Sequence, residues 1–451
     1  MTLLRPRWGL SPACFTARQR QKKCCILCWK RVSSYFCVPN GLVMNSPASP
    51  PIFNASSSAA AFSPIEWTDP ARACAFADWL ATTSQSHGLV PASVRLASAD
   101  ASFRRYFRVD AAAGGSFIIM DAPPALENCQ SFVDIAALMT AAGLNAPKVL
   151  AWDAAAGFML LTDLGGQTMM EAIAPPAAVA EIAQPNAATQ AMYMSAVDAL
   201  IAWQLASKPG VLPPYDDALL SRELALFPDW YIGKYRGFTL SNQQQTTLDD
   251  AFALIKASNL NALDGARVFV HRDFMPRNLM VPPLENAAPL SKQGPRDWLR
   301  QTAGAAAPSG GSAGRVVTSV GVLDFQDAVY GPITYDIASL LRDAFLSWEE
   351  DFVLDITVRY WQKARKAGLP VGDDFGEFYR AVEWMGLQRH LKILGIFARL
   401  TLRDGKPKYL LDTPRFIKYA RATCMRYRQL GPLMVLLDEI EGNETRVGYT
   451  F

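Results

Sequence analysis

Short apolar runs separated by turn residues dominate the chain between residues 94 and 161. These strand-like runs cover 94–96, 106–109, 117–120, 148–152 and 158–161. Gly114 and Gly115, between the second and third runs, predict a tight hairpin turn. Apolar residues at helical spacing then predict one helix, which ends at Gly143. A further helix is predicted over 68–86, so this part of the chain is expected to form an antiparallel sheet with packed helices.

Beyond residue 164 the apolar positions recur mainly at helical spacing. Met194, Val197, Ile201 and Leu205 form one such stripe. Further helices are predicted over 218–236, 242–259, 336–347, 350–367 and 376–402. Two strand-like runs, 268–270 and 320–323, lie among these helices. The pattern predicts an α+β protein with a sheet-rich lobe over 65–163 and a mainly helical lobe over 164–451.

The composition is that of a soluble globular enzyme. Of 451 residues, 50% are hydrophobic and 19% are charged. No apolar run approaches the length of a membrane span, so we expect a cytoplasmic protein with no membrane partner. Nothing in the sequence indicates the oligomeric state.

The net charge of +3 is unevenly distributed. Eight of the 44 basic residues lie in residues 1–43, which contain no acid, so the rest has 36 basic and 41 acidic residues. A body with a net charge of −5 is not expected to bind nucleic acid. We interpret residues 1–64 as a disordered or spurious extension, with Met44 as the expected start of the functional protein. Cys25 and Cys28 form a C-x-x-C, but no second ligand pair accompanies them.

Residues 281–319 are rich in Pro, Ala, Gly and Ser, with stretches such as PPLENAAPL and AGAAAPSGGSAG. Such a composition buries too little apolar surface to order itself. We interpret the segment as a flexible surface loop inserted between two short strands of a hairpin. A functional lid is the alternative, because long structureless loops are unusual in compact domains.

The candidate chemistry flanks this insertion. His271, Asp273 and Asn278 stand in the order H-R-D-x-x-x-x-N, which is typical of a kinase catalytic loop. Asp324 follows Asn278 by 46 residues, after an apolar run, where kinases keep a second metal-binding carboxylate. Phosphoryl transfer needs a carboxylate to accept a hydroxyl proton and oxygen ligands to hold Mg²⁺ against the phosphates. The pattern therefore predicts a phosphotransferase that uses ATP and Mg²⁺, although Asp273 and Asn278 could instead only shape a turn.

Longer stretches around these motifs resemble the aminoglycoside phosphotransferase / choline kinase-like family, from about residue 98 to about residue 408. One subgroup is especially similar: the bacterial sugar kinases of cell-wall recycling that phosphorylate the anomeric hydroxyl of N-acetylmuramate and N-acetylglucosamine. The similar stretches are SADASFRRYFR (98–108), MDAPPALENCQSFVDIA (120–136), ELALFPDWY (223–231), HRDFMPRNLM (271–280), GVLDFQDAVYGPITYD (321–336), GLQRHLKILGIFARL (386–400) and RDGKPKYL (403–410). The resemblance implies a bilobal protein-kinase-like fold and the same activity in peptidoglycan recycling.

The resemblance also implies roles for single residues. Asp273 would orient and deprotonate the sugar hydroxyl, while Asn278 and Asp324 would bind Mg²⁺ that bridges the nucleotide phosphates. His271 would brace the loop. Asp336 would begin a helix and tie the catalytic loop together.

For the nucleotide, the resemblance implies a hinge and a covering turn. Thr162, Asp163 and Leu164 lie where a hinge between the lobes would offer backbone groups to adenine. The turn from Ser98 to Arg105 would cover the phosphates, with Ser102 and backbone N–H groups as donors.

The chain departs from kinases at Met120, which stands where they carry a strand lysine that grips the phosphates. The candidates to replace its charge are Arg104, Arg105 and Arg108. Alternation along a strand would send Arg104 and Arg108 to one face and Arg105 to the other. The acid that would pair with this charge stays open between Glu127 and Asp134.

An N-acetyl sugar needs hydrogen bonds to its hydroxyls, and muramate adds a carboxylate that an arginine would hold. The candidate contacts are Arg222, Glu223, Asp327, Arg389 and His390. An aminoglycoside or other small-molecule hydroxyl kinase is the alternative enzyme. We prefer the amino sugar because residues 376–410 are basic and suit an anionic substrate. An alternative of another class is a nucleotide-binding pseudokinase, favoured by the missing lysine and disfavoured by the retained Asp273.

Overall fold

The computed structural model describes residues 65–99, 103–173, 185–281 and 320–443. The interpretations of residues 1–64, of Ser102 and of the segment 282–319 lie outside these residues.

The amino-terminal lobe is built on a five-stranded antiparallel sheet in the order β1-β2-β3-β5-β4. Its strands are β1 (Arg95–Ala99), β2 (Arg105–Asp110), β3 (Ser116–Asp121), β4 (Val149–Asp153) and β5 (Phe158–Thr162). The turn between β2 and β3 contains Gly114 and Gly115, with φ of 96° and 80°. Positive φ is open to glycine at little cost, so the predicted hairpin turn is confirmed.

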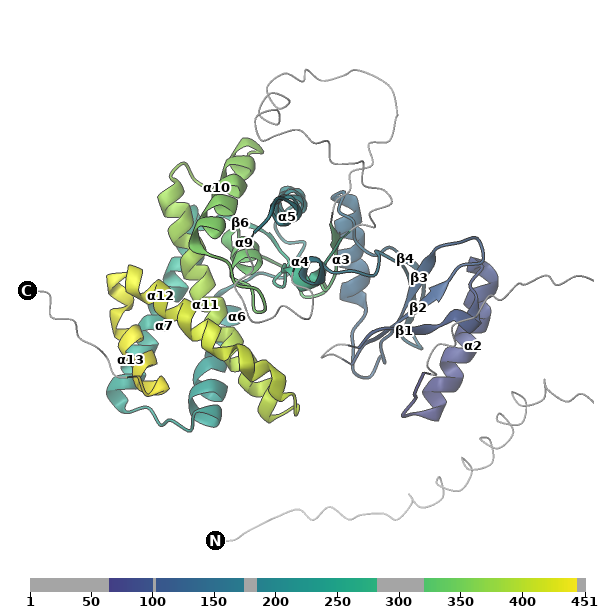
Figure 1. The fold of residues 1–451 in the computed structure, drawn as a ribbon, viewed down its shortest axis with the longest axis horizontal. Helices are drawn as coiled ribbons and strands as arrows, with labels where there is room; N and C mark the ends of the chain where they lie inside the picture. The colour runs from purple at the N-terminus through teal and green to yellow at the C-terminus, as the bar shows by residue number, and fades with distance from the viewer. Residues whose placement is uncertain (1–64, 100–102, 174–184, 282–319, 444–451) are drawn as a thin grey trace, which may run out of the picture. The chain divides into compact units, whose positions relative to one another are not determined.

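One helix packs on each face of this sheet (Figure 1). α2 (Pro70–His87) begins where Asp69 accepts a hydrogen bond from the backbone of Ala71, and it packs Phe76 against the sheet. α3 (Gln130–Ala141) contributes Phe132, Ile135 and Met139 to the buried cluster that contains Met120 on the other face of the sheet. The predicted sheet with packed helices is therefore confirmed.

The remainder of the described chain is mainly helical (Figure 1). Its α-helices are α4 (Met169–Ile173), α5 (Ala187–Leu205), α6 (Asp217–Leu226), α7 (Asn242–Gly265), α9 (Thr334–Leu341), α10 (Glu350–Lys366), α11 (Phe375–Leu402), α12 (Thr413–Arg426) and α13 (Gly431–Glu441). Short 3-10 turns are η1 (Pro91–Ser93), η4 (Pro276–Asn278), η6 (Pro407–Asp412) and η7 (Arg428–Leu430), and η3 (Phe227–Tyr235) is a π-helix. α11 is buried over much of its length and contacts α6, α7, α9 and α12. No helix in the described part of the chain is long and apolar enough to cross a membrane.

Three predicted elements differ from the structure. The helix predicted over 218–236 is instead α6 followed by the π-helix, because Pro228 has no N–H to continue the α-helical ladder. The helix predicted over 336–347 ends at Leu341, because Arg342 leaves helical geometry at φ −113° and ψ 56°. The helix predicted over 242–259 continues to Gly265, with non-helical backbone inside its last turn.

Two small antiparallel sheets carry the candidate chemistry. β6 (Arg267–Val270) pairs with β9 (Val329–Pro332), and β7 (Leu279–Met280) pairs with β8 (Gly321–Val322). The pairing of β7 with β8 confirms the hairpin predicted on either side of the insertion. β8 also reaches the segment after α3, because the Val322 N–H donates to the Asn145 carbonyl over 2.8 Å.

Candidate active site

The catalytic loop leaves β6 at His271 and is held by a carboxylate at the start of α9. Asp336 accepts hydrogen bonds from the backbone N–H groups of His271 (2.7 Å) and Arg272 (3.0 Å). Asp336 is fully buried in the first turn of α9. The expectation that Asp336 begins a helix and ties the loop together is confirmed, with the helix starting two residues earlier at Thr334.

His271 joins the two halves of the motif. Its Nδ1 accepts from the Asp273 N–H over 3.2 Å, so the proton lies on Nε2, which is 3.0 Å from the Leu323 carbonyl. Burial lowers the pKa of His271 to about 4 and keeps the ring neutral. A neutral ring with both nitrogens in hydrogen bonds braces the loop, as expected.

Asp273 is half-buried and is fixed through its backbone. Its N–H donates to His271, and its carbonyl accepts from the side-chain amide of Asn278 over 2.9 Å. These bonds hold the loop without engaging the Asp273 carboxylate. The residue is therefore placed in a fixed frame with its acidic group available for chemistry.

Asn278 and Asp324 lie side by side. Asn278 Nδ2 is 3.3 Å from Asp324 Oδ2, and Gln326 Nε2 donates to Asp324 Oδ1 over 2.8 Å. Asp324 has φ 64°, in the left-handed region. Gln326 was not among the predicted site residues, because nothing in the motif indicates that its side chain turns back on Asp324.

Asn278 and Asp324 both carry oxygen atoms of the kind that magnesium binds. Magnesium in nucleotide enzymes is commonly bound through one or two protein oxygens together with substrate phosphates and water. The Asn278 Nδ2 donates to the Asp273 carbonyl and lies beside the Asp324 carboxylate. The Asn278 Oδ1, on the other side of the amide, therefore faces away from both of these groups. Within the described residues there is no group of three or more His, Cys, Asp or Glu side chains that could hold a metal ion.

Arg104, directly before β2, and Arg105, the first residue of β2, lie on opposite faces of the sheet, as alternation predicts. Arg104 lies beside Glu127, with Nε 3.1 Å from Oε2. Arg105 faces α2, where it pairs with Asp121 at 2.6 Å and stacks on Trp67. The Arg105 guanidinium is engaged on the opposite face of the sheet from α3, which argues against contact with a nucleotide.

The two candidate acids have different partners in the structure. Glu127 accepts a hydrogen bond from Arg104, whereas Asp134 accepts one from Gln130 within α3. Met120, at the position of the missing lysine, is fully buried in the core that includes α3.

The predicted hinge residues are firmly held. The Asp163 carboxylate accepts from Arg108 (2.5 Å) and Ser116 (2.7 Å). Burial opposes ionisation of Asp163, but these hydrogen bonds outweigh it and lower its pKa. Thr162 is the last residue of β5. The Leu164 side chain packs so closely against Gly321 that a Cβ on Gly321 would clash with it. These side chains are thus engaged by the protein itself, and the Thr162 N–H donates to the Lys148 carbonyl over 3.1 Å.

The five residues predicted to contact the sugar fall into two groups. Arg222 and Asp327 are exposed. Three are buried, with exposed fractions of 4% for Glu223, 4% for Arg389 and 2% for His390. His390 stacks on Tyr419 with 5.0 Å between ring centroids, and burial lowers its pKa to about 3. The buried group is thus packed into the interior, which argues against direct contact with a sugar.

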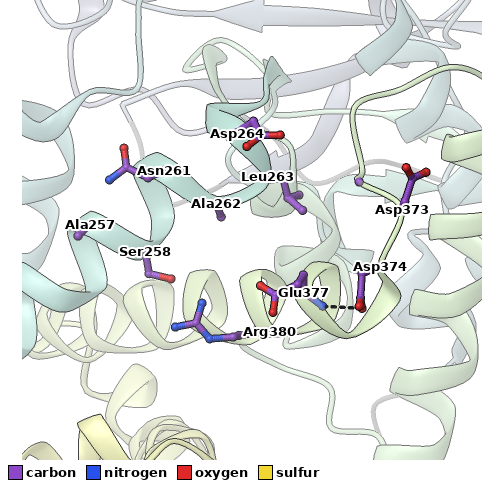
Figure 2. A pocket seen from close by; sticks show the side chains of 11 residues that line it. Ala257, Ser258, Asn261, Ala262, Leu263, Asp264, Asp373, Asp374, Glu377 and Arg380 are labelled. Atoms are coloured by element: carbon purple, nitrogen blue, oxygen red, sulfur yellow. Dashed lines mark hydrogen bonds between the residues drawn. The ribbon is translucent and has the colours of Figure 1, made fainter.

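A cavity of about 570 Å³ lies away from these residues. It is formed by the end of α7 and the start of α11 (Figure 2). Asp264, Asp373, Asp374 and Glu377 line it, and Asp374 is occupied in capping α11. No residue of the catalytic loop lines the cavity, and its carboxylates would repel nucleotide phosphates.

The sheet lobe, the helical lobe and the catalytic loop with its carboxylate-amide pair define a kinase-like phosphotransferase. The chain belongs to the phosphotransferase enzyme family, whose sequence profile matches residues 93–288 and 314–375. The predicted family and the predicted bilobal α+β fold are both confirmed.

Two of the relatives that this chain resembles in sequence share the same name. A Neisseria meningitidis protein named N-acetylmuramate/N-acetylglucosamine kinase is 41% identical over 379 residues, which cover 83% of this chain and 98% of that protein. A Pseudomonas aeruginosa protein of the same name is 44% identical over 352 residues, covering 78% and 89%. Among solved structures, a choline kinase from Cryptosporidium parvum has a TM-score of 0.49 at 9% identity, covering 80% of this chain and 99% of that one.

Proposed function

We propose that this protein is an ATP-dependent kinase that phosphorylates the anomeric hydroxyl of N-acetylmuramate, N-acetylglucosamine or both, in peptidoglycan recycling in the cytoplasm. The observation that carries the proposal is the meeting of Asp273, Asn278 and Asp324 at one site. The names of relatives at 41% and 44% identity support the choice of sugar.

In the proposed reaction, Asp273 accepts the proton of the sugar hydroxyl as its oxygen bonds to the γ-phosphorus of ATP. The bond from that phosphorus to the β,γ-bridging oxygen breaks, and ADP leaves. Asn278 and Asp324 would hold Mg²⁺, which supplies positive charge against the phosphate oxygens. Gln326 and Asn278 hold the Asp324 carboxylate in place from both of its oxygens.

Arg104 is our candidate for the charge that Met120 does not supply. It lies on the face of β2 towards α3, and its ion pair with Glu127 fixes the direction of its side chain. A guanidinium in this place would contact the α and β phosphates, as the strand lysine does in kinases. Ser102 would cover the phosphates, and the backbone of residues 162–164 would meet adenine.

For the sugar we retain the two exposed candidates, Arg222 and Asp327. The electrostatic preference for anionic muramate is weaker than the sequence indicates. Two of the basic residues in 376–410, Arg389 and Lys392, are buried and engaged with other protein groups. The choice of an amino sugar therefore rests mainly on the names of the relatives at 41% and 44% identity.

The decisive test is ADP release, measured in a coupled assay with N-acetylmuramate, N-acetylglucosamine and kanamycin as acceptors. We expect turnover with one or both amino sugars, no turnover with kanamycin, and loss of turnover in Asp273→Ala. Turnover with kanamycin alone would favour an aminoglycoside kinase. Nucleotide binding without turnover on any acceptor would favour a pseudokinase.

A further inference from the structure

Arg272, the residue before the proposed base, has a backbone conformation that is unfavourable for residues other than glycine. Its φ of 78° lies in the left-handed region, which residues other than glycine rarely adopt. The backbone is held by Asp336 at the N–H and by Arg389 Nη1, which donates to the carbonyl over 2.7 Å. The side chain is held separately, because Arg272 Nη2 donates to Glu223 Oε1 over 2.5 Å.

Glu223 receives hydrogen bonds from four side chains. Oε1 accepts from Arg272 and from Lys392 Nζ at 2.7 Å, while Oε2 accepts from the Tyr215 hydroxyl at 2.7 Å and from Gln388 Nε2 at 3.0 Å. Two donors on each oxygen use the hydrogen-bonding capacity of a carboxylate. No acceptor site is left for a sugar hydroxyl, although the sequence suggests Glu223 for that role.

Lys392 completes the cluster from α11. Its ammonium is bonded to Glu223 and lies 3.1 Å from the Tyr335 hydroxyl. A buried charge is tolerated only when it is paired and hydrogen-bonded. Loss of Glu223 would therefore leave the buried Lys392 and the partly buried Arg272 without the carboxylate that pairs with both of them.

We propose that Glu223 and Lys392 are positioning residues. Together with Arg272 they form a buried charge clamp that maintains the left-handed backbone at Arg272 and thereby aims the Asp273 carboxylate at the acceptor. The clamp acts through Arg272 and touches neither sugar nor nucleotide. This inference rests on the proposed function, because it takes Asp273 as the base.

The test compares Glu223→Gln, Lys392→Met and the double variant with the parent enzyme. Glutamine keeps the shape of glutamate. Its two N–H groups can be accepted by the Tyr215 hydroxyl and by the Gln388 amide oxygen after each rotates, so the charge is what changes. We expect kcat per ADP-binding site to fall roughly 10- to 100-fold in Glu223→Gln, with KM for ATP and sugar within about twofold. The double variant restores the net charge of the clamp and should recover part of kcat, as coupled residues do.

Asp217→Asn is the matched control. Asp217 also lies on α6, but its ion pair with Lys256, at 2.9 Å, is near the surface. This variant should keep the parent kcat. Counting active sites by ADP titration ensures that kcat refers to folded protein.

Three results would overturn the clamp. Parent-like kcat per site in Glu223→Gln, with a lowered melting temperature, would reduce the cluster to a fold-stabilising role. A rise in KM for sugar with unchanged kcat would make Glu223 a substrate contact. Hydrogen–deuterium exchange of residues 268–280 decides the question without turnover, because the clamp predicts faster exchange there in Glu223→Gln and unchanged exchange refutes it. If the parent enzyme turns over no sugar, the proposed function fails while the exchange result still judges the clamp.

Discussion

Asn278 Nδ2 lies 3.3 Å from Asp324 Oδ2, although 46 residues separate the two along the chain. The short pairing of β7 with β8 brings them together, and the Leu323 N–H donates to the Asn278 carbonyl over 2.9 Å. The candidate metal pair is therefore built by the two ends of one hairpin. Its geometry depends on the strands that flank the insertion and on Gln326, which holds the other oxygen of Asp324.

Gln326→Ala should weaken the response to Mg²⁺. The substitution removes the 2.8 Å hydrogen bond to Asp324 Oδ1 and lets the carboxylate rotate. Loss of a group that orients a metal ligand typically costs about 10- to 100-fold in metal affinity. We expect the Mg²⁺ concentration for half-maximal ADP release to rise by about that factor, with kcat largely recovered at saturating Mg²⁺. An unchanged Mg²⁺ titration would show that Gln326 does not orient the metal carboxylate.

Two adjacent arginines provide a test of the phosphate contact. Arg104→Met removes the cation on the α3 face of β2, so KM for ATP should rise roughly tenfold, the scale of one charge-assisted hydrogen bond. Arg105→Met removes a similar side chain on the α2 face, where it pairs with Asp121. That variant should lower the melting temperature and leave KM for ATP unchanged. Equal effects of the two substitutions on KM would refute the assignment to Arg104.

The sequence was most informative where chemistry is local. The spacing from His271 to Asn278 and the apolar run before Asp324 sufficed to find residues that the fold brings together. The five strands of the sheet follow from short apolar runs with turn residues between them. In both cases the determining interactions lie within a few residues of the signal.

The sequence was least informative for polar residues placed by long-range packing. From the sequence Glu223 is a candidate sugar contact, yet four side chains from distant parts of the chain bond to it. They come from the catalytic loop, from the segment before α6 and from α11. The Arg104–Glu127 pair joins a strand to the segment before α3, and no pattern selects Glu127 over Asp134. β9 and the helices α12 and α13 were not predicted either.

His271→Gln should make the free energy of unfolding less dependent on pH between pH 7 and pH 5. Burial lowers the pKa of His271 to about 4 from an ordinary value of about 6.5. Between these pH values the unfolded chain binds a proton that the folded chain does not, so stability falls as pH falls. For this group the loss between pH 7 and pH 5 is about 2 kcal/mol. His390 and Asp336 titrate in both proteins, so the difference between them isolates His271.

Urea unfolding at pH 7 and pH 5 measures this difference. The parent should lose more unfolding free energy on acidification than His271→Gln, which is less stable at pH 7 but less dependent on pH. Parallel losses in the two proteins would mean that His271 is not held neutral by burial.

Replacing residues 284–317 by a six-residue Gly-Ser linker should leave the enzyme active. Met280 and Gly321 are paired across the β7–β8 hairpin, so a short linker can span the gap between the strands. Each halving of a flexible loop changes the closure free energy by only about 0.6 kcal/mol. We expect kcat within about twofold of the parent and a melting temperature that is unchanged or slightly raised. Gly321→Val is the contrasting variant, because a Cβ at Gly321 would lie 2.9 Å from Leu164 Cδ1 and 3.0 Å from Met280 Cβ. This single substitution should destabilise the protein more than removal of the insertion does. A large loss of kcat on loop replacement, with the fold intact, would instead assign the insertion a part in catalysis.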